Sequence, residues 1–158
     1  MTKHQPKKRV DIVSLQLVKE ASTMYAARRC SNPEALYQLF APFIEKKDRE
    51  HMIVAGLNTK GEPTFIHIAH IGTVNQALAF PRDILKPALL SNSVSICVGH
   101  NHPAGSTDAS LADIEFTSKL EKACKLLQIR LQDHLIIASS GEYLSMRAEG
   151  YINDGATS

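Results

Sequence analysis

Hydrophobic and polar positions follow two different periods along this chain. Three segments repeat their apolar residues every three or four positions, which is the spacing of an amphipathic helix. Between them lie shorter apolar runs bounded by turn residues, which are typical of strands. The helices are expected at residues 33–44, 81–90 and 110–127, and the strands at 50–57, 63–71, 93–98, 130–139 and 142–147. The order of these elements predicts a single mixed α/β domain.

Residues that start helices and make turns mark the boundaries of several elements. Pro33 follows Asn32 where a helix can begin, because the fixed backbone of proline suits the first turn. The turn residues 58–61 join two strands into a hairpin. In the helix at 110–127, the residues expected to face the core are Leu111, Phe116, Leu120, Ala123 and Leu127.

The two ends of the chain differ from the domain between them. Residues 1–9 carry Lys3, Lys7, Lys8 and Arg9 with little to bury, which predicts a flexible basic arm. Residues 10–18 are rich in β-forming side chains, and we expect them to add an edge strand to the sheet. The predicted domain therefore extends over residues 10–150, and residues 151–158 form a C-terminal tail.

Composition indicates an ordinary globular domain, with 44% hydrophobic and 22% charged residues. A net charge of +2 is small for a dedicated DNA-binding protein, although the basic arm leaves contact with nucleic acid as an alternative. The sequence has neither a signal peptide nor an apolar run long enough to span a bilayer, so we expect a cytoplasmic protein without a membrane partner.

The three cysteines, Cys30, Cys97 and Cys124, are far apart and form no Cys-x-x-Cys pair. This spacing suggests neither a disulfide framework nor a thiolate zinc site, and it predicts a reducing compartment. Cys97 and Cys124 lie in apolar surroundings, so we expect both to be buried.

The candidate chemistry lies in residues 99–113. His100 and His102 alternate, so in an extended or looped chain both imidazoles face the same side. Ser110 and Asp113, three residues apart at the start of a helix, share one face of its first turn. Two His nitrogens, one Asp oxygen and a water form the kind of zinc site that is typical of catalysis. We therefore predict one Zn²⁺ per chain, held by His100, His102 and Asp113, while the ligand types leave Mn²⁺, Fe²⁺ and Co²⁺ open.

A zinc hydrolase also needs a carboxylate that is close to the metal without binding it, to accept a proton from the attacking water. The candidates upstream of the histidines are Glu34, Glu45, Glu50 and Glu62, and their spacing does not select one. His51 and His134 are expected to be structural.

The pattern His-x-His-x₇-Ser-x₂-Asp resembles the signature of the JAMM (MPN+) metalloproteases, and its surroundings resemble their bacterial RadC branch. The similarity extends over about residues 32–150 and includes Asp133-His134-Leu135-Ile136-Ile137. It implies a curved mixed β-sheet flanked by helices, like that of cytidine deaminases, whose own cysteine motif is missing from this sequence. The resemblance also implies that Glu50 is the catalytic carboxylate.

The activity predicted from this site is zinc-dependent hydrolysis of a peptide or isopeptide bond. Glu50 would take a proton from the attacking water and return it to the leaving amine, and the Ser110 hydroxyl would donate to the developing oxyanion. Two alternatives stay open: a nucleic-acid-binding protein associated with DNA repair, and a metal-binding interaction scaffold with weak or no hydrolysis. Only about thirty residues precede the first domain helix, too few for the helix-hairpin-helix-like region of full-length RadC proteins, which weakens the first alternative.

Overall fold

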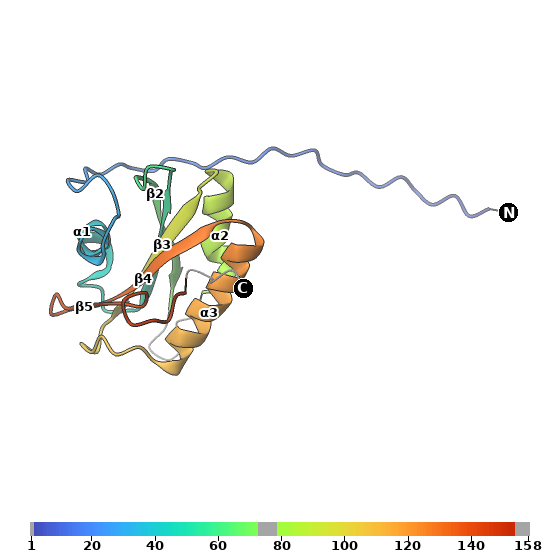
Figure 1. The fold of residues 1–158 in the computed structure, drawn as a ribbon. Helices are drawn as coiled ribbons and strands as arrows, with labels where there is room; N and C mark the ends of the chain where they lie inside the picture. Colours follow the sequence, from blue (N-terminus) through green and yellow to red (C-terminus); the bar gives the residue numbers. More distant parts are fainter. Residues whose placement is uncertain (1, 73–78, 154–158) are drawn as a thin grey trace.

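A computed structural model describes residues 2–72 and 79–153. Within these ranges a five-stranded sheet has the strand order β2-β1-β3-β4-β5 (Figure 1). β1 (His51–Leu57) pairs antiparallel with both β2 (Pro63–Ile71) and β3 (Ser95–His102). β3 pairs in parallel with β4 (Arg130–Ala138), and β5 (Tyr143–Ser145) returns antiparallel to β4. The sheet is therefore mixed, as predicted.

Helices cover both faces of this sheet. α1 (Pro33–Ile44) lies on one face, and α2 (Pro81–Leu90) and α3 (Leu111–Leu126) lie on the other (Figure 1). Neighbouring residues of the central strands alternate between two cores, so that Ile53 packs with α1 whereas Val54 packs with α2 and α3. Because both faces are covered, the central strands are nearly continuous apolar runs. The expectation of a single α/β domain with helices flanking a mixed sheet is confirmed.

The predicted starts and turns agree with the structure. α1 begins at Pro33, and the Asn32 side chain caps it by accepting a hydrogen bond from the Ala35 amide at 2.8 Å. Gly61 ends the β1–β2 turn with a φ of 75°, a backbone conformation that glycine adopts without strain. The connection expected at residues 72–80 lies mostly outside the described residues. Cys97 and Cys124 are buried, as predicted, and burial raises the pKa of the Cys124 thiol to about 12.

Two of the residues predicted to face the core from α3 are exposed instead. Leu111 is 79% exposed and Leu127 is 43% exposed, whereas Phe116 and Leu120 are buried. Leu111 lies roughly half a turn around the helix from Leu120, so it points away from the sheet. Leu127 is the C-cap residue, beyond the last helical position. The apolar stripe of α3 is therefore shorter than the one predicted.

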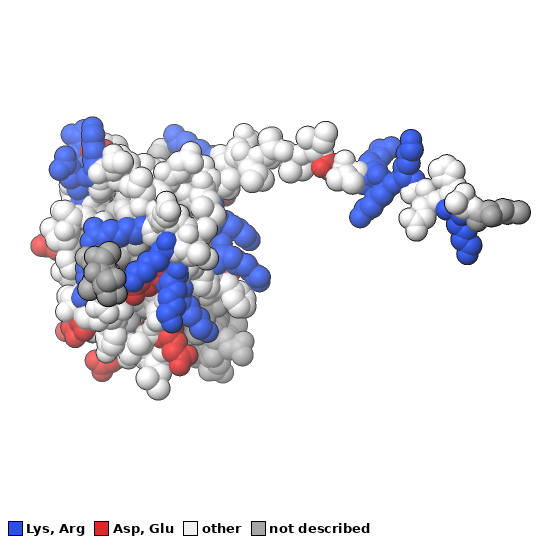
Figure 2. Space-filling model, turned by 45° about the vertical axis from the view of Figure 1, so that its right-hand side comes forward, with Lys and Arg blue, Asp and Glu red and all other residues white. Residues whose placement is uncertain are grey.

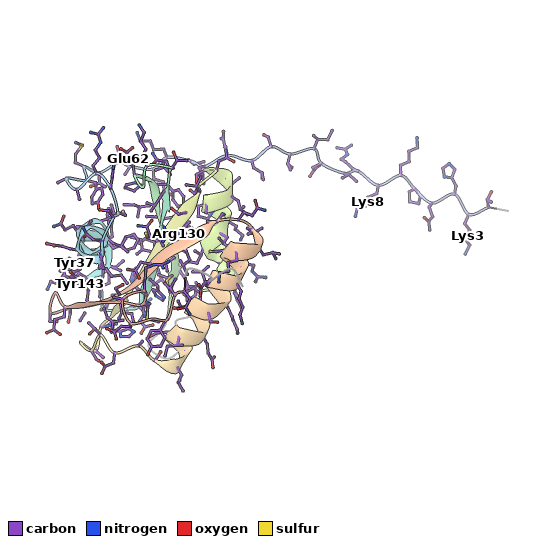
Figure 3. All side chains as sticks on the ribbon, in the orientation of Figure 1. Lys3, Lys8, Tyr37, Glu62, Arg130 and Tyr143 are labelled. Carbon is purple, nitrogen blue, oxygen red and sulfur yellow. The ribbon has the colours of Figure 1, made fainter. Side chains whose placement is uncertain are left out.

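The edge strand predicted at residues 10–18 is wrong. Residues 2–24 extend away from the domain without secondary structure, and Ile12 and Leu15 are 101% and 77% exposed (Figure 1). Lysine and arginine side chains are spaced along this arm, including Lys3 and Lys8 (Figures 2 and 3). A β-forming sequence becomes a strand only where a sheet edge pairs with it, and this segment has no such partner in the described structure.

Several contacts at residues 25–30 join the arm to the domain. The Tyr25 hydroxyl donates to the Ala35 carbonyl at 2.8 Å, and the Cys30 amide donates to the Gly61 carbonyl at 2.9 Å. The ordered part of the fold therefore begins close to residue 25. Within residues 2–72 and 79–153, no helix is both long enough and apolar enough to cross a membrane.

Candidate metal centre

β3 carries both histidines of the candidate site. The strand continues to His102, where the sequence predicted a loop after residue 98, because its pairing with β4 extends to His102 opposite Ala138. His100 and His102 project from the face that α3 covers, and their Nε2 atoms lie 2.9 Å apart. The strand itself therefore brings the two imidazoles together.

The first turn of α3 brings the carboxylate to the same point. Ser110 is the N-cap: its Oγ accepts a hydrogen bond from the Asp113 amide at 3.1 Å, and the Ser110 amide donates to Asp113 Oδ2 at 2.9 Å. This capping box fixes the Asp113 side chain at the helix start. Its Oδ1 lies 3.2 Å from His100 Nε2, and its Oδ2 lies 3.2 Å from His102 Nε2.

These three side chains can hold a metal ion. Ligand atoms around a tetrahedral Zn²⁺ are separated by about 3.3 Å when each bond is about 2.0–2.1 Å long. The two Nε2 atoms lie 2.9 Å apart, each is 3.2 Å from a different oxygen of Asp113, and the three candidate ligand atoms all lie within 4.8 Å of one another. Nitrogen and carboxylate oxygen suit several divalent metals. The side chain of His102 is 14% exposed, against 5% for His100, so the group is reached from the His102 side.

The electrostatics of the site favour an ionised carboxylate. Burial raises the pKa of Asp113, but hydrogen bonds from His100, His102 and the Ser110 amide outweigh it and hold that pKa well below its usual range. Burial lowers the pKa of His102, but contact with Asp113, the Ser106 carbonyl and the charge of Glu50 together raise it. A negative ligand is therefore available at neutral pH.

The orientation of His102 is set by a backbone group. Its Nδ1 lies 2.9 Å from the carbonyl oxygen of Ser106. A carbonyl only accepts hydrogen bonds, so Nδ1 carries a proton and Nε2 is the nitrogen that faces His100 and Asp113. His102 therefore presents Nε2 to a metal ion, which displaces any proton on that nitrogen when it binds.

Glu50 directly precedes β1, next to the strand that carries the histidines. The paired register of β1 and β3 ends at Met52 opposite His100, two residues after Glu50. The charge of Glu50 contributes to raising the pKa of His102, so its carboxylate lies near that ring. By contrast, Glu45 accepts a hydrogen bond from Tyr37, and Glu62 forms an ion pair with Arg28. The role of Glu50 as a base stays a prediction.

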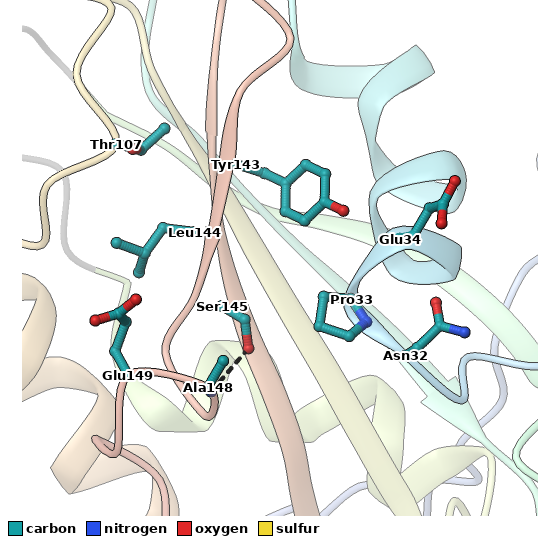
Figure 4. Close-up of a pocket in the computed structure, with 9 residues that line it drawn as sticks. All are labelled: Asn32, Pro33, Glu34, Thr107, Tyr143, Leu144, Ser145, Ala148 and Glu149. Carbon is teal, nitrogen blue, oxygen red and sulfur yellow. Dashed lines mark hydrogen bonds between the residues drawn. The ribbon is translucent and has the colours of Figure 1, made fainter.

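A pocket of about 600 Å³ lies beside the loop that joins β3 to α3 (Figure 4). Thr107 of that loop forms one wall, and the other walls come from the start of α1, from β5 and from the turn after it. Tyr143 on β5 stacks on Tyr37 of α1 with ring centroids 4.9 Å apart, as Figure 3 shows, and this contact joins two of the walls. The pocket is adjacent to the metal-centre loop but does not include the three candidate ligands.

Comparison with known proteins identifies the domain. The family model for the RadC-like JAB domain matches residues 30–151, which include all of the described helices and strands. This chain belongs to the RadC-like JAB family. The match begins at Cys30, where the backbone is bonded to Gly61, so the exposed arm lies outside it.

Relatives of this RadC-like JAB domain include proteins of archaea and bacteria. A UPF0758 protein of Methanosarcina mazei is 36% identical over 125 residues, which are 79% of this chain and 54% of the relative. A UPF0758 protein of Haemophilus ducreyi is 34% identical over 145 residues, which are 88% of this chain and 65% of the relative. The chain thus spans between about half and two thirds of the length of these relatives.

Sequence reasoning missed two residues that support the candidate metal centre of this RadC-like JAB domain. His134, expected to be structural, lies with its Nε2 2.7 Å from His100 Nδ1. Asn101, between the two histidines, accepts a hydrogen bond from the His51 amide at 2.6 Å and donates to the Arg49 carbonyl at 2.9 Å. These contacts join residues that are 34 to 52 positions apart, so no local pattern signals them.

Proposed function

We propose that this domain is a zinc-dependent peptidase or isopeptidase. The observation that carries the proposal is the convergence of the Nε2 atoms of His100 and His102 and the ionised carboxylate of Asp113 at the end of β3, with the three ligand atoms within 4.8 Å of one another. The influence of the Glu50 charge on the pKa of His102 supports Glu50 as the carboxylate that a hydrolase needs.

The residues of the site divide the chemistry between them. His100, His102 and Asp113 would hold zinc, which polarises a carbonyl and lowers the pKa of a bound water to about 7. A Glu50 carboxylate oxygen takes up a proton from the attacking water and passes it to the nitrogen of the leaving amine. Ser110 Oγ accepts from the Asp113 amide, which leaves its own hydrogen free to donate to the developing oxyanion.

Elemental analysis of the purified full chain after zinc loading tests the metal centre. We expect about one zinc per chain in the parent and little in Asp113→Ala, since a structural carboxylate ligand is lost. Asp83→Ala is the matched control, because Asp83 also accepts a hydrogen bond from its helix N-cap amide, at 3.2 Å, but in α2. Equal zinc in the parent and in Asp113→Ala would contradict the ligand assignment.

Hydrolysis of a panel of internally quenched peptides tests the activity. The parent should cleave at least one of them, and a chelator should abolish the cleavage. Glu50→Gln should keep its zinc and lose at least about 10²-fold in rate, because the proton acceptor is gone. Glu62→Gln, which changes a carboxylate at the β1–β2 turn, should cleave like the parent. Zinc binding without turnover in every assay would favour the scaffold alternative.

A second candidate function rests on the basic arm. Exposed lysine and arginine side chains follow one another along residues 3–9, away from the metal centre (Figure 2). Such an array attracts the phosphates of nucleic acid, and that binding weakens steeply as salt increases. A salt-sensitive gel shift would support this function, whereas peptide cleavage blocked by a chelator supports the first. The substrate, the nucleic-acid partner and a cytoplasmic location all stay predictions.

A further inference from the structure

A chain of buried hydrogen bonds lies behind His100, on the side away from the other two ligands. His100 Nδ1 is 2.7 Å from His134 Nε2, and His134 Nδ1 is 2.7 Å from Thr117 Oγ1. The Thr117 hydroxyl in turn donates to the Asp113 carbonyl at 2.7 Å. His134 and Thr117 are each 0% exposed, so water does not compete for these bonds.

The last hydrogen bond of this series, from Thr117 to Asp113, decides which atom donates in each of the others. The Asp113 carbonyl can only accept, so the single hydroxyl hydrogen of Thr117 is committed to it. Thr117 Oγ1 must therefore accept from His134, which places a proton on His134 Nδ1. With that proton on Nδ1, the other ring nitrogen of neutral His134, Nε2, accepts from His100.

These hydrogen bonds also determine which nitrogen of His100 faces the other two candidate ligands. His100 Nδ1 must carry a proton to donate to His134, so Nε2 is the ring nitrogen that faces His102 and Asp113 and is left to bind a metal ion. The opposite tautomer would place two bare nitrogens, one from each ring, face to face at 2.7 Å. Phe116, packed edge-on to His134 with ring centroids 6.0 Å apart, closes the apolar side of this arrangement.

We propose that His134 and Thr117 are positioning residues, which fix the tautomer and ring orientation of His100 and so prepare its Nε2 to bind the metal. The inference rests on the proposed function only in taking His100 as a metal ligand. It assigns α3 a second task. The helix supplies Asp113 as one candidate ligand, and one turn later it supplies Thr117, which acts through His134 on His100.

The matched pair Thr117→Val and Thr117→Ser tests this inference in the full chain. Valine has nearly the shape of threonine but cannot accept from His134, whereas serine keeps the hydroxyl. We expect Thr117→Val to bind zinc about 10- to 100-fold more weakly in a competition titration against a chelator, and Thr117→Ser to bind within about threefold of the parent. Circular dichroism and thermal unfolding identify any variant that fails to fold. As a second pair, His134→Gln should retain more zinc affinity than His134→Leu, because the glutamine amide oxygen can still accept from His100.

Nitrogen-15 NMR of the imidazole rings in the metal-free chain gives a second measurement, independent of zinc and of turnover. The parent should show His100 protonated at Nδ1, and Thr117→Val should show a mixture of tautomers. Parental zinc affinity together with a single His100 tautomer in Thr117→Val would overturn the inference. Failure of the parent itself to bind zinc would instead overturn the proposed function, and the ring tautomers would still decide the positioning role.

Discussion

Asn101 lies between the two candidate histidine ligands in sequence, but its amide group bonds to the segment that precedes β1. The side chain accepts from the His51 amide and donates to the carbonyls of Lys47 and Arg49. Glu50 lies within this short segment, and its carbonyl accepts from the Gly72 amide at 2.8 Å. One buried amide thus holds the backbone on both sides of the candidate base.

Asn101→Ala should therefore impair catalysis more than it impairs metal binding. The change removes three hydrogen bonds to the backbone, of which only the one to the Arg49 carbonyl has a second partner, the His51 ring, and it should lower the free energy of unfolding by about 2 kcal/mol. We expect zinc content to stay near that of the parent while the rate of peptide cleavage falls, because the backbone on both sides of Glu50 is no longer held. Chemical denaturation, elemental analysis and the peptide assay measure the three effects.

Asn58→Ala is the control for this prediction. Asn58 also bonds to backbone amides, those of Lys60 and Glu62, but it does so in the β1–β2 turn. It should lose stability and keep its rate of cleavage. A parental rate in Asn101→Ala would show that the Glu50 segment is held by other contacts.

Local sequence patterns were sufficient to predict the candidate ligands but not the residues behind them. His-x-His and Ser-x-x-Asp act within one strand end and one helical turn, so their geometry follows from local backbone periods. His134 reaches His100 only because β3 and β4 pair in parallel, which places His134 opposite Val98. Such a pairing depends on the whole fold, and no spacing in the sequence encodes it.

At the scale of elements, β3 is confined between two layers. Its Gly99 points toward α1, and a Cβ atom at that position would lie 2.6 Å from Phe40 Cδ2 and 3.3 Å from Ile53 Cγ2. The absence of a side chain allows α1 to approach the strand directly beside His100. The close packing of α1 therefore helps to fix the position of the end of β3 that carries His100 and His102.

Gly99→Ala should displace this strand. We expect the free energy of unfolding to fall by about 1–3 kcal/mol, because a methyl group is forced into a filled core. Zinc affinity should fall as well, since His100 moves with the backbone. Phe40→Leu in the same chain should restore part of both losses by removing ring atoms from the contact, and urea unfolding with chelator competition measures them. Unchanged stability in Gly99→Ala would mean that α1 adjusts without cost.

The elements themselves were predicted well because both helix and strand periods are strong in this chain. The failures are at residues whose environment is decided by partners outside their own segment. Leu111 has the composition of a core position but lies on the far side of α3, and residues 10–18 have the composition of a strand without a sheet edge to pair with. The extension of β3 through His102 likewise depends on its pairing with β4.

At the scale of the whole molecule, the chain consists of a compact domain and an exposed arm. The family match over residues 30–151 and the first anchoring contact, made by Tyr25, agree on where the domain begins. Among residues 2–24, six apolar side chains from Val10 to Val18 are exposed, and the His4 ring bonds only to the carbonyl of its neighbour Gln5 in the described structure. The arm therefore adds little to the folding energy of the domain.

Removal of residues 2–24 should leave the domain intact. We expect the free energy of unfolding to change by less than about 0.5 kcal/mol, with zinc content and cleavage rate unchanged, because exposed residues without packing contribute little. Tyr25→Phe, which loses the bond to the Ala35 carbonyl, should cost about 1 kcal/mol and serves as the contrast. If the parent shifts nucleic acid in a gel, the truncated chain should not. A large loss of stability on truncation would show that the arm packs against the domain in solution.

The contacts of the Asp113 carboxylate would link metal binding to the rate at which the protein is degraded. Oδ2 accepts the Ser110 amide that starts α3, and both oxygens lie against the histidines of β3. Under the proposed function, a bound ion would tie the sheet to the helix as a reversible cross-link, and the unfolded chain could not form it. A ligand that binds only the folded form stabilises it with the logarithm of its free concentration. The rate at which proteases clear this protein from its surroundings would then follow the supply of free zinc.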